Sequence, residues 1–244
     1  MATNPMHQFE VYRIGPEIKL GEVDLSFTNA SLFMVISLIT ILLIFNLGSK
    51  KNSLIPNKIQ LLAELSYGFV SKMISDTAGS KAKPYFSFIF SLFMFVLFLN
   101  MFGMVPYSFT VTSHIIVTFV LATFIFVGVT IIGFIKHGAG YLKLFVPSGV
   151  PIVLLPLIVL IEIISYLSRP ISLSVRLFAN MMAGHTMLKV FGGFVISLGM
   201  LGGWLPLGFS VALTGLEILV AFLQAYVFAI LTCIYLNDAL NLHH

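Results

Sequence analysis

The sequence predicts an all-α polytopic membrane protein with five membrane helices and one amphipathic surface helix. Of its 244 residues, 59% are hydrophobic and only 9% are charged, and the mean hydropathy is +1.05. Several apolar stretches exceed the roughly 18 residues that indicate a membrane span, and residues 84–135 contain no Asp, Glu, Lys or Arg. A soluble domain needs far more charge to cover its surface. A membrane β-barrel needs alternating rather than continuous apolar residues.

The N-terminal part is predicted to hold one upright span and the surface helix. Residues 1–24 are polar and acidic, so we expect an outer-side segment rather than a signal peptide, which opens with basic residues and a short apolar core. Residues 25–47 form the first span. After a basic link, residues 58–77 place apolar and charged side chains on different sides of a helix. This pattern is typical of a helix that lies on the membrane surface.

The next two spans are predicted to form a hairpin. Residues 84–105 and 114–135 are both apolar, and the link between them is short and uncharged. His114 stands at the start of its span, and we expect it at the membrane interface.

The last two apolar segments are too long to stand upright. Residues 151–191 span roughly 60 Å as a helix, about twice the hydrocarbon thickness of a bilayer. This helix is therefore either strongly tilted or broken, with Pro156 and Pro170 as candidate kink positions. Residues 205–237 are also too long, and the glycine-rich stretch 192–203 is expected to form a turn that joins the two helices into a hairpin.

The lysines indicate how the chain is oriented. Eight lysines lie in the polar stretches 50–83 and 136–143, which places these stretches on the cytoplasmic or matrix side. The N-terminus then lies outside, and five spans bring the C-terminus inside. The basic residues form no patch typical of nucleic-acid binding. The lone Cys233 allows no disulfide within the chain and is expected to be a small buried side chain.

Ionisable side chains concentrate in the last two apolar segments, where each costs about 2.5–3.5 kcal/mol on insertion scales and thus indicates function. Glu162, Arg169 and Arg176 are seven residues apart and share one helix face. Asn180 extends that face, whereas His185 falls on roughly the other side. A second stripe on the last segment follows helical spacing and contains Ser210, Thr214, Glu217 and Gln224. The two stripes are predicted to face each other or a shared partner.

These side chains suit proton transfer. Glu162, His185 and Glu217 can each exchange a proton if burial or a neighbour tunes the pKa. Arg176 cannot, because its guanidinium stays protonated. As a fixed cation, it can attract a carboxylate and repel a passing proton, which is the behaviour of a gate.

Structural explanations remain open for several of these residues. Arg169 can extend its head group to the interface, and Glu162 can be a solvated rim charge. Arg176 with Asn180 can form an interhelical pair, and His185 can be a hydrogen-bonding contact between helices. Glu217 is harder to explain structurally, because an uninterrupted apolar run follows it.

Specific motifs resemble the subunit a family of F-type ATP synthases, in the form found in alphaproteobacteria and mitochondria. Residues 168–185, SRPISLSVRLFANMMAGH, closely resemble the family signature, and residues 216–228, LEILVAFLQAYVF, resemble its last helix. Residues 99–106 and 108–137 also resemble the family, so the resemblance covers nearly the whole chain.

The resemblance implies that the two long helices lie almost flat in the membrane against a rotating ring of c subunits. Arg176 then corresponds to the family's obligatory arginine, which faces a ring carboxylate, and Asn180 and Gln224 are polar positions beside it. The other implied partners are the b subunits of the peripheral stalk, the remainder of the ATP synthase and membrane lipid. No cofactor or metal is implied, and ATP is made on other subunits.

The resemblance also implies two offset half-channels for protons. Glu162 lines the one to the cytoplasm or matrix, and His185 and Glu217 line the other. Many bacterial members carry Glu and His at these last two positions in the opposite order, and some carry an acid at the position of Gly103. The exchanged pair points to a bacterial inner membrane or, as the alternative, a mitochondrial one.

Three other functions compete with that of a proton channel. A secondary transporter predicts an internal repeat, and none is found. A haem-binding electron carrier needs axial ligands at membrane depth, and only His185 is well placed. A non-conducting membrane anchor has no need for ionisable residues such as Arg176 and Glu217 within its spans.

Overall fold

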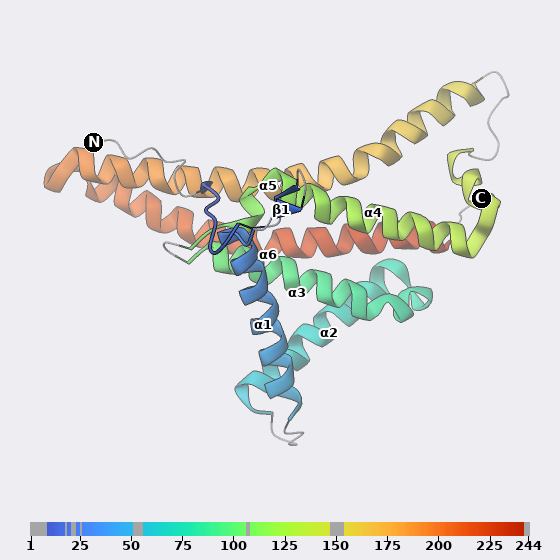
Figure 1. Ribbon diagram of the computed structural model, residues 1–244, viewed down its shortest axis with the longest axis horizontal. Coiled ribbons are helices and arrows are strands. Elements are labelled where there is room, and N and C mark those ends of the chain that lie inside the picture. Colours follow the sequence, from blue (N-terminus) through green and yellow to red (C-terminus); the bar gives the residue numbers. More distant parts are fainter. Residues whose placement is uncertain are drawn as a thin grey trace.

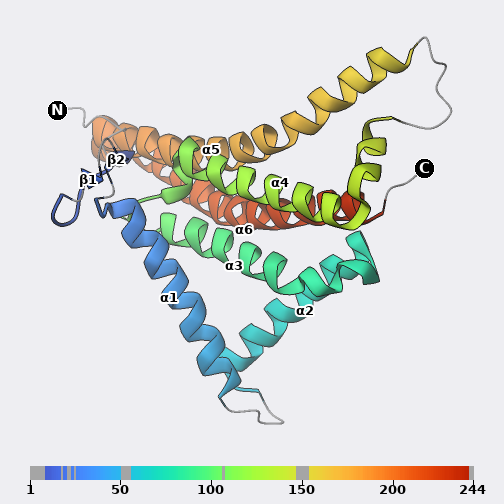
Figure 2. The same cartoon turned by 45° about the vertical axis from the view of Figure 1, so that its right-hand side comes forward.

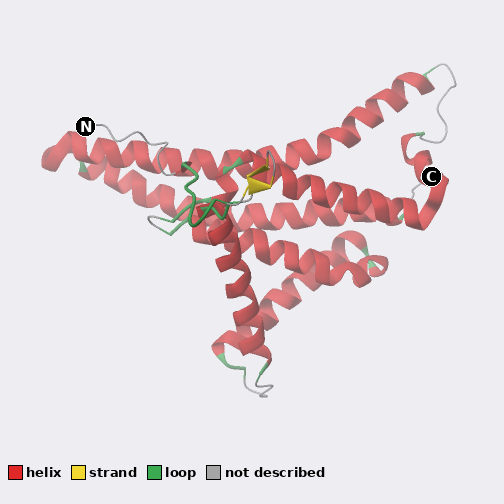
Figure 3. Cartoon of the chain, viewed as in Figure 1, coloured by secondary structure: helices red, strands yellow, loops and turns green. Residues whose placement is uncertain are grey.

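The chain folds into helices almost throughout (Figures 1 and 3). The computed structural model describes residues 9–17, 19–20, 23–24, 26–50, 56–105, 108–146 and 154–241. Within these ranges, the α-helices are α1 (Asn29–Ser49), α2 (Lys58–Ala78), α3 (Phe86–Gly103), α4 (Ile115–His137), α5 (Leu155–Gly202) and α6 (Trp204–Leu240). Further 3₁₀ helices cover Ser80–Tyr85, Val111–Ser113 and Gly138–Phe145. The strands β1 (Lys19–Leu20) and β2 (Val23–Asp24) pair antiparallel.

Five helices in the described part of the chain are long and apolar enough to cross a membrane, and α2 is not among them. This confirms the predicted all-α polytopic class, with five membrane helices and one further amphipathic helix. The predicted beginning of the fourth apolar segment at residue 151 lies outside the described residues.

Helices α1 and α2 project from the rest of the molecule, and together with α3 they outline a triangle (Figure 2). Thr28 begins α1, because its side chain accepts a hydrogen bond from the Ser31 amide. Only Ser37 and Gly48 of α1 are buried, so most of its apolar surface is open. In α2, Met73 is buried on the predicted apolar side, whereas Ile59, Leu62 and Phe69 are exposed.

Helix α6 forms the centre of the bundle, where it packs against α2, α3, α4 and α5. Its buried face is rich in small side chains, including Ala221, Ala225 and Ala229, which allow neighbouring helices to approach closely. Phe228 lies between them and fills the core together with Phe93 of α3 and Leu177 of α5. This packing fixes α5 and α6 side by side as an antiparallel pair (Figure 1).

Helix α5 is longer than the sequence predicted. It covers 48 residues, with a kink at Gly199 close to its end. Pro156 lies in its first turn, and Pro170 lies in its interior without a departure from helical backbone angles. The one non-helical residue is Gly199, with φ of 59° and ψ of −156°. The predicted turn over residues 192–203 was therefore wrong in extent, because glycines weaken a helix by about 1 kcal/mol without having to end it.

The corner between α5 and α6 depends on glycine at two positions. The positive φ of Gly199 disfavours any residue with a side chain. A Cβ at Gly203 would lie 2.6 Å from the Gly199 carbonyl oxygen and 2.7 Å from that of Val195. Because both are backbone atoms, they cannot rotate away from a new methyl group.

We therefore expect Gly203→Ala to destabilise the hairpin by about 1–3 kcal/mol through overpacking. The measurement is the melting temperature of the purified complex in detergent. Gly208→Ala is the matched control, since a Cβ there has nothing within 4 Å. Equal melting temperatures for the two variants would contradict this account of the corner.

Candidate functional site

Three polar contacts join α5 to α6 along the length of the hairpin. They are Arg169 with Asp238, Asn180 with Gln224, and His185 with Glu217. The two polar stripes of the sequence therefore face each other in part. Arg176 and Glu162 make no such contact.

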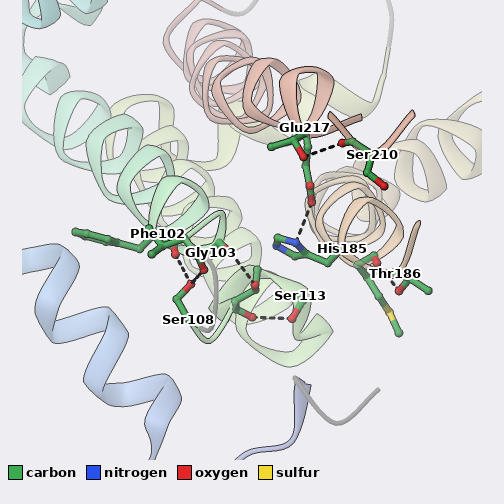
Figure 4. Close-up of polar contacts among 12 residues, drawn as sticks. Phe102, Gly103, Ser108, Ser113, His185, Thr186, Ser210 and Glu217 are labelled. Carbon is green, nitrogen blue, oxygen red and sulfur yellow. Dashed lines mark hydrogen bonds and ion pairs between the residues drawn. The ribbon is translucent and has the colours of Figure 1, made fainter. Parts of the chain in front are cut away.

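His185 and Glu217 form a buried pair (Figure 4). His185 Nδ1 lies 3.0 Å from Glu217 Oε1, and the two residues are only 8% and 4% exposed. Neither carboxylate oxygen has a well-aligned hydrogen bond from the described residues, and His185 Nε2 has no partner among them. A proton can thus move between the two side chains without a change in their total charge.

A glycine makes room for this pair. A Cβ at Gly184 would lie 2.6 Å from Glu217 Oε1 and 3.0 Å from its Cδ. Any larger residue at this position must push the carboxylate away from His185. Sequence reasoning did not identify this role, because the contact joins residues 33 positions apart.

Amide side chains of α5, α6 and α3 make two further polar contacts beside α6. Asn180 Nδ2 donates to Gln224 Oε1 at 2.9 Å, and Gln224 is 3% exposed. Asn100 of α3 donates its Nδ2 to the Ala221 carbonyl at 3.1 Å. Asn100 was not predicted as a site residue, although it is a single amide in an otherwise apolar run and could have been noticed for that reason.

Arg169 is half-buried and pairs with a residue near the end of α6, and its expected interfacial position stays a prediction. Its Nη1 lies 3.0 Å from Asp238 Oδ2. Its guanidinium lies over the rings of Tyr166 and Tyr235, at 5.2 and 5.0 Å from their centroids. Asp238 was missed, yet it lies 14 residues after Gln224. The seven-residue spacing from Glu217 to Gln224 reaches Asp238 after two further steps, so this spacing could have identified Asp238.

Arg176 lies on α5, close enough to Tyr235 of α6 for its charge to be felt there. It is exposed, and it makes no hydrogen bond or ion pair with any residue that the structure describes. Exposed side chains near it on α5 include the small Ser168, Ser172, Ala179 and Ala183 and the larger Ile171 and Val175. Glu162 is half-buried and likewise makes no such bond within the described ranges.

His114 lies at the end of the 3₁₀ helix Val111–Ser113. It is half-buried rather than fully at the surface, and its ring stacks on Phe109 at a centroid distance of 5.0 Å. Burial lowers the pKa of His114, so the neutral imidazole is favoured. Among the described residues, no three His, Cys, Asp or Glu side chains form a group that could hold a metal ion.

Comparison with known proteins gives one consistent result. Residues 31–237 match the family model described as ATP synthase A chain. The chain is 88% identical over 244 residues to ATP synthase subunit a of Pelagibacter ubique (strain HTCC1062), with 100% of both chains covered. It is 59% identical over 250 residues to the subunit a of Chelativorans sp. (strain BNC1), again with 100% of both covered. The subunit a of Rhizobium rhizogenes is 59% identical over 247 residues, which cover 99% of this chain and 98% of that one.

Proposed function

The chain belongs to the ATP synthase subunit a family, the proton-translocating component of the membrane sector, and we propose that Arg176 separates two half-channels at the surface of a ring of c subunits. Protons that pass through these half-channels drive rotation of the ring, which is coupled to ATP synthesis. The chain itself is not a catalytic subunit of the complex.

The exposed and unpaired state of Arg176 carries this proposal. Its guanidinium keeps its charge at any physiological pH, and an unpaired charge within a membrane helix is costly. The described part of the chain offers it no carboxylate. Its counter-charge therefore comes from another subunit, and a ring carboxylate meets that need.

The surface around Arg176 supports contact with another helix. Ala179 and Ala183 lie close to Arg176 along the exposed side of α5, and small residues let a second helix approach closely. Other exposed positions differ, since α4 presents Ile116 and Ile135 at 66% and 81% exposure. Bulky apolar side chains of this kind suit contact with lipid.

The buried pair of His185 and Glu217 supports the outer half-channel. Both groups exchange protons, and their contact within a span has no evident structural need. A proton reaching this pair passes to a ring carboxylate as that group leaves Arg176. After almost a full turn, the ring site releases its proton near Glu162 into the inner half-channel. A membrane potential supplies about 2.3 kcal/mol per charge per 100 mV.

The lysine distribution supports a defined orientation. It places the N-terminus outside and the C-terminus in the cytoplasm. The three relatives named above come from bacteria, which favours a bacterial inner membrane over a mitochondrial one. The open apolar surface of α1 is available for the b subunits of the peripheral stalk and for lipid.

Disulfide cross-linking tests the proposed contact with the ring. Ala179→Cys, in a Cys233→Ala background, is combined with a cysteine beside the ring carboxylate. We expect a cross-link on mild oxidation and a stop to rotation that reduction reverses. Phe124→Cys is the control, because Phe124 is exposed on a different helix, α4. Cross-linking from position 124 but not from 179 would reject the proposed face.

Gly184→Ala tests whether the His185–Glu217 contact matters for conduction. The new methyl group displaces the Glu217 carboxylate, so we expect proton-driven ATP synthesis to fall about tenfold, which corresponds to ~1.4 kcal/mol. The rate is measured in membrane vesicles with the assembled complex. Gly193→Ala is the control, because a Cβ there meets nothing within 4 Å. If both variants kept the parental rate, the contact would have no part in conduction.

A further inference from the structure

A pocket of about 360 Å³ lies near the end of α6, away from the proposed proton path. Residues of the 3₁₀ helix Ser80–Tyr85, of the last turns of α4 and of the end of α6 line it. Figure 2 shows these three segments together at one end of the molecule. Leu240, which lines the pocket from α6, follows Glu217 by 23 residues, or roughly 35 Å of helix. Small-molecule sites typically have volumes of about 300–1,000 Å³, so this pocket is large enough to hold a ligand.

Two lysines from different segments give the pocket its charge. Lys81 belongs to the 3₁₀ helix, and Lys136 lies in the last turn of α4. Lys81 Nζ donates to Asn241 Oδ1 at 2.7 Å, which is a neutral partner. Lys136 makes no hydrogen bond or ion pair with a residue that the structure describes. No acidic side chain is among the described residues that line the pocket, and the nearest acid along α6, Asp238, pairs with Arg169. The two ammonium groups are therefore available to an anion.

The remaining lining of the pocket is largely apolar. Its apolar residues are Pro84, Ile132, Ile135 and Leu240. Lys81 begins one candidate membrane span, and Lys136 lies near the end of another. Lysines at the ends of spans lie at the level of the lipid head groups, whereas apolar residues further into the span lie at the level of the acyl chains. Inorganic phosphate gains nothing from the apolar side chains, so the lining favours an anion with an apolar part.

We propose that this pocket binds an anionic phospholipid at the inner membrane face, with its phosphate between Lys81 and Lys136 and its acyl chains along Ile132 and Ile135. Tyr85 also lines the pocket, and its phenol can donate a further hydrogen bond to a phosphate oxygen. Basic pockets between membrane helices on the cytoplasmic side typically bind anionic head groups. The proposed orientation places this pocket on that side. The site goes beyond the proposed function, because none of the residues proposed to translocate protons lines it.

Photochemical labelling in vesicles tests this lipid site. The intact complex is reconstituted with phosphatidylglycerol that carries a diazirine near the start of one acyl chain, and labelled peptides are identified by mass spectrometry. We expect label on the α4 peptide that contains Ile132 and Ile135. Lys81→Gln combined with Lys136→Gln should raise the amount of lipid needed for half-maximal labelling about tenfold, because each lysine near the membrane surface attracts anionic lipid. Lys83→Gln is the matched control, since Lys83 is exposed on the same 3₁₀ helix but does not line the pocket.

Three results of the labelling would overturn the proposal. The first is equal labelling of the parent and the double variant. The second is equal labelling by phosphatidylcholine of the same design, whose head group has no net charge. The third is displacement of the lipid by inorganic phosphate, which would show that the site takes a free anion. If the double variant does not assemble, Lys136→Gln alone serves, because it breaks no bond with a described residue, and labelling about threefold weaker is expected.

Thermal stability gives a second measurement. A ligand that binds only the folded complex raises its melting temperature. Addition of phosphatidylglycerol to the detergent-purified complex is therefore expected to raise the melting temperature of the parent and of Lys83→Gln equally, and that of the double variant by less. An equal rise in all three would contradict a site at Lys81 and Lys136. Neither measurement requires proton flow, so the lipid site stands or fails independently of the role proposed for Arg176.

Discussion

Arg176→Ala is expected to abolish proton-driven ATP synthesis, by at least about 100-fold or ~2.7 kcal/mol, while the complex still assembles. The side chain makes no hydrogen bond or ion pair within the described chain, so its removal breaks no bond of either kind there. Under the proposed function, what is lost is a fixed cation that draws a ring carboxylate into its ionised form and repels protons between the half-channels. ATP synthesis in membrane vesicles, with assembly checked on native gels, measures the effect.

Two further variants make this test specific. Arg176→Lys keeps a cation, but an ammonium group in a low-dielectric site can lose its proton and cannot bond a carboxylate in a fork. We therefore expect a large loss here too. Val175→Ala changes the neighbouring exposed side chain and should leave the rate unchanged. A normal rate in Arg176→Ala would favour a passive anchor over a channel.

The second large effect is expected at the buried pair. Glu217→Gln and His185→Gln should each slow proton-driven ATP synthesis at least about tenfold, because each removes a proton-exchanging group and leaves its partner buried without it. The two side chains are 3.0 Å apart, so their effects should not add. The double variant is expected to resemble the worse single variant.

Exchange of the two residues tests more directly whether the contact between them is required for proton-driven ATP synthesis. His185→Glu combined with Glu217→His restores one acid and one imidazole at the same place. We expect the exchanged pair to recover part of the rate that either single exchange loses. Ser210→Ala serves as the control, because the Ser210 hydroxyl bonds only to the Pro206 carbonyl of its own helix. Additive losses with no recovery would show that contact between the two is not required.

The five spans could be predicted from the sequence because the membrane makes the signal strong. An apolar run long enough to span a bilayer has few alternative structures, since every backbone group must be bonded within the segment. Ionisable side chains are costly within a membrane span, and Arg176, His185 and Glu217 could be noticed in the sequence for that reason. Family resemblance then supplied the roles of these residues, which spacing alone had left open.

Other features could not be predicted because they depend on contacts between distant residues. Gly192 and Gly199 are alike in sequence, but only Gly199 has a positive φ, and only it interrupts α5. Thr110 and Thr112 are also residues of one type, and the fold alone decides which of the two hydroxyls has a partner. The pairing of Arg169 with Asp238 could not be predicted either, because the two residues lie 69 positions apart on different helices.

The two ends of the α5–α6 hairpin are both fastened. At one end, Arg169 is held by Asp238 and two tyrosine rings, and at the other, Gly199 and Gly203 form a tight corner. Two helices that are joined at both ends of their contact bend less easily than two helices joined at one end. In a rotary machine, the stationary part must withstand the torque of the moving part. Under the proposed function, such stiffness keeps the gap between Arg176 and the ring constant throughout each revolution.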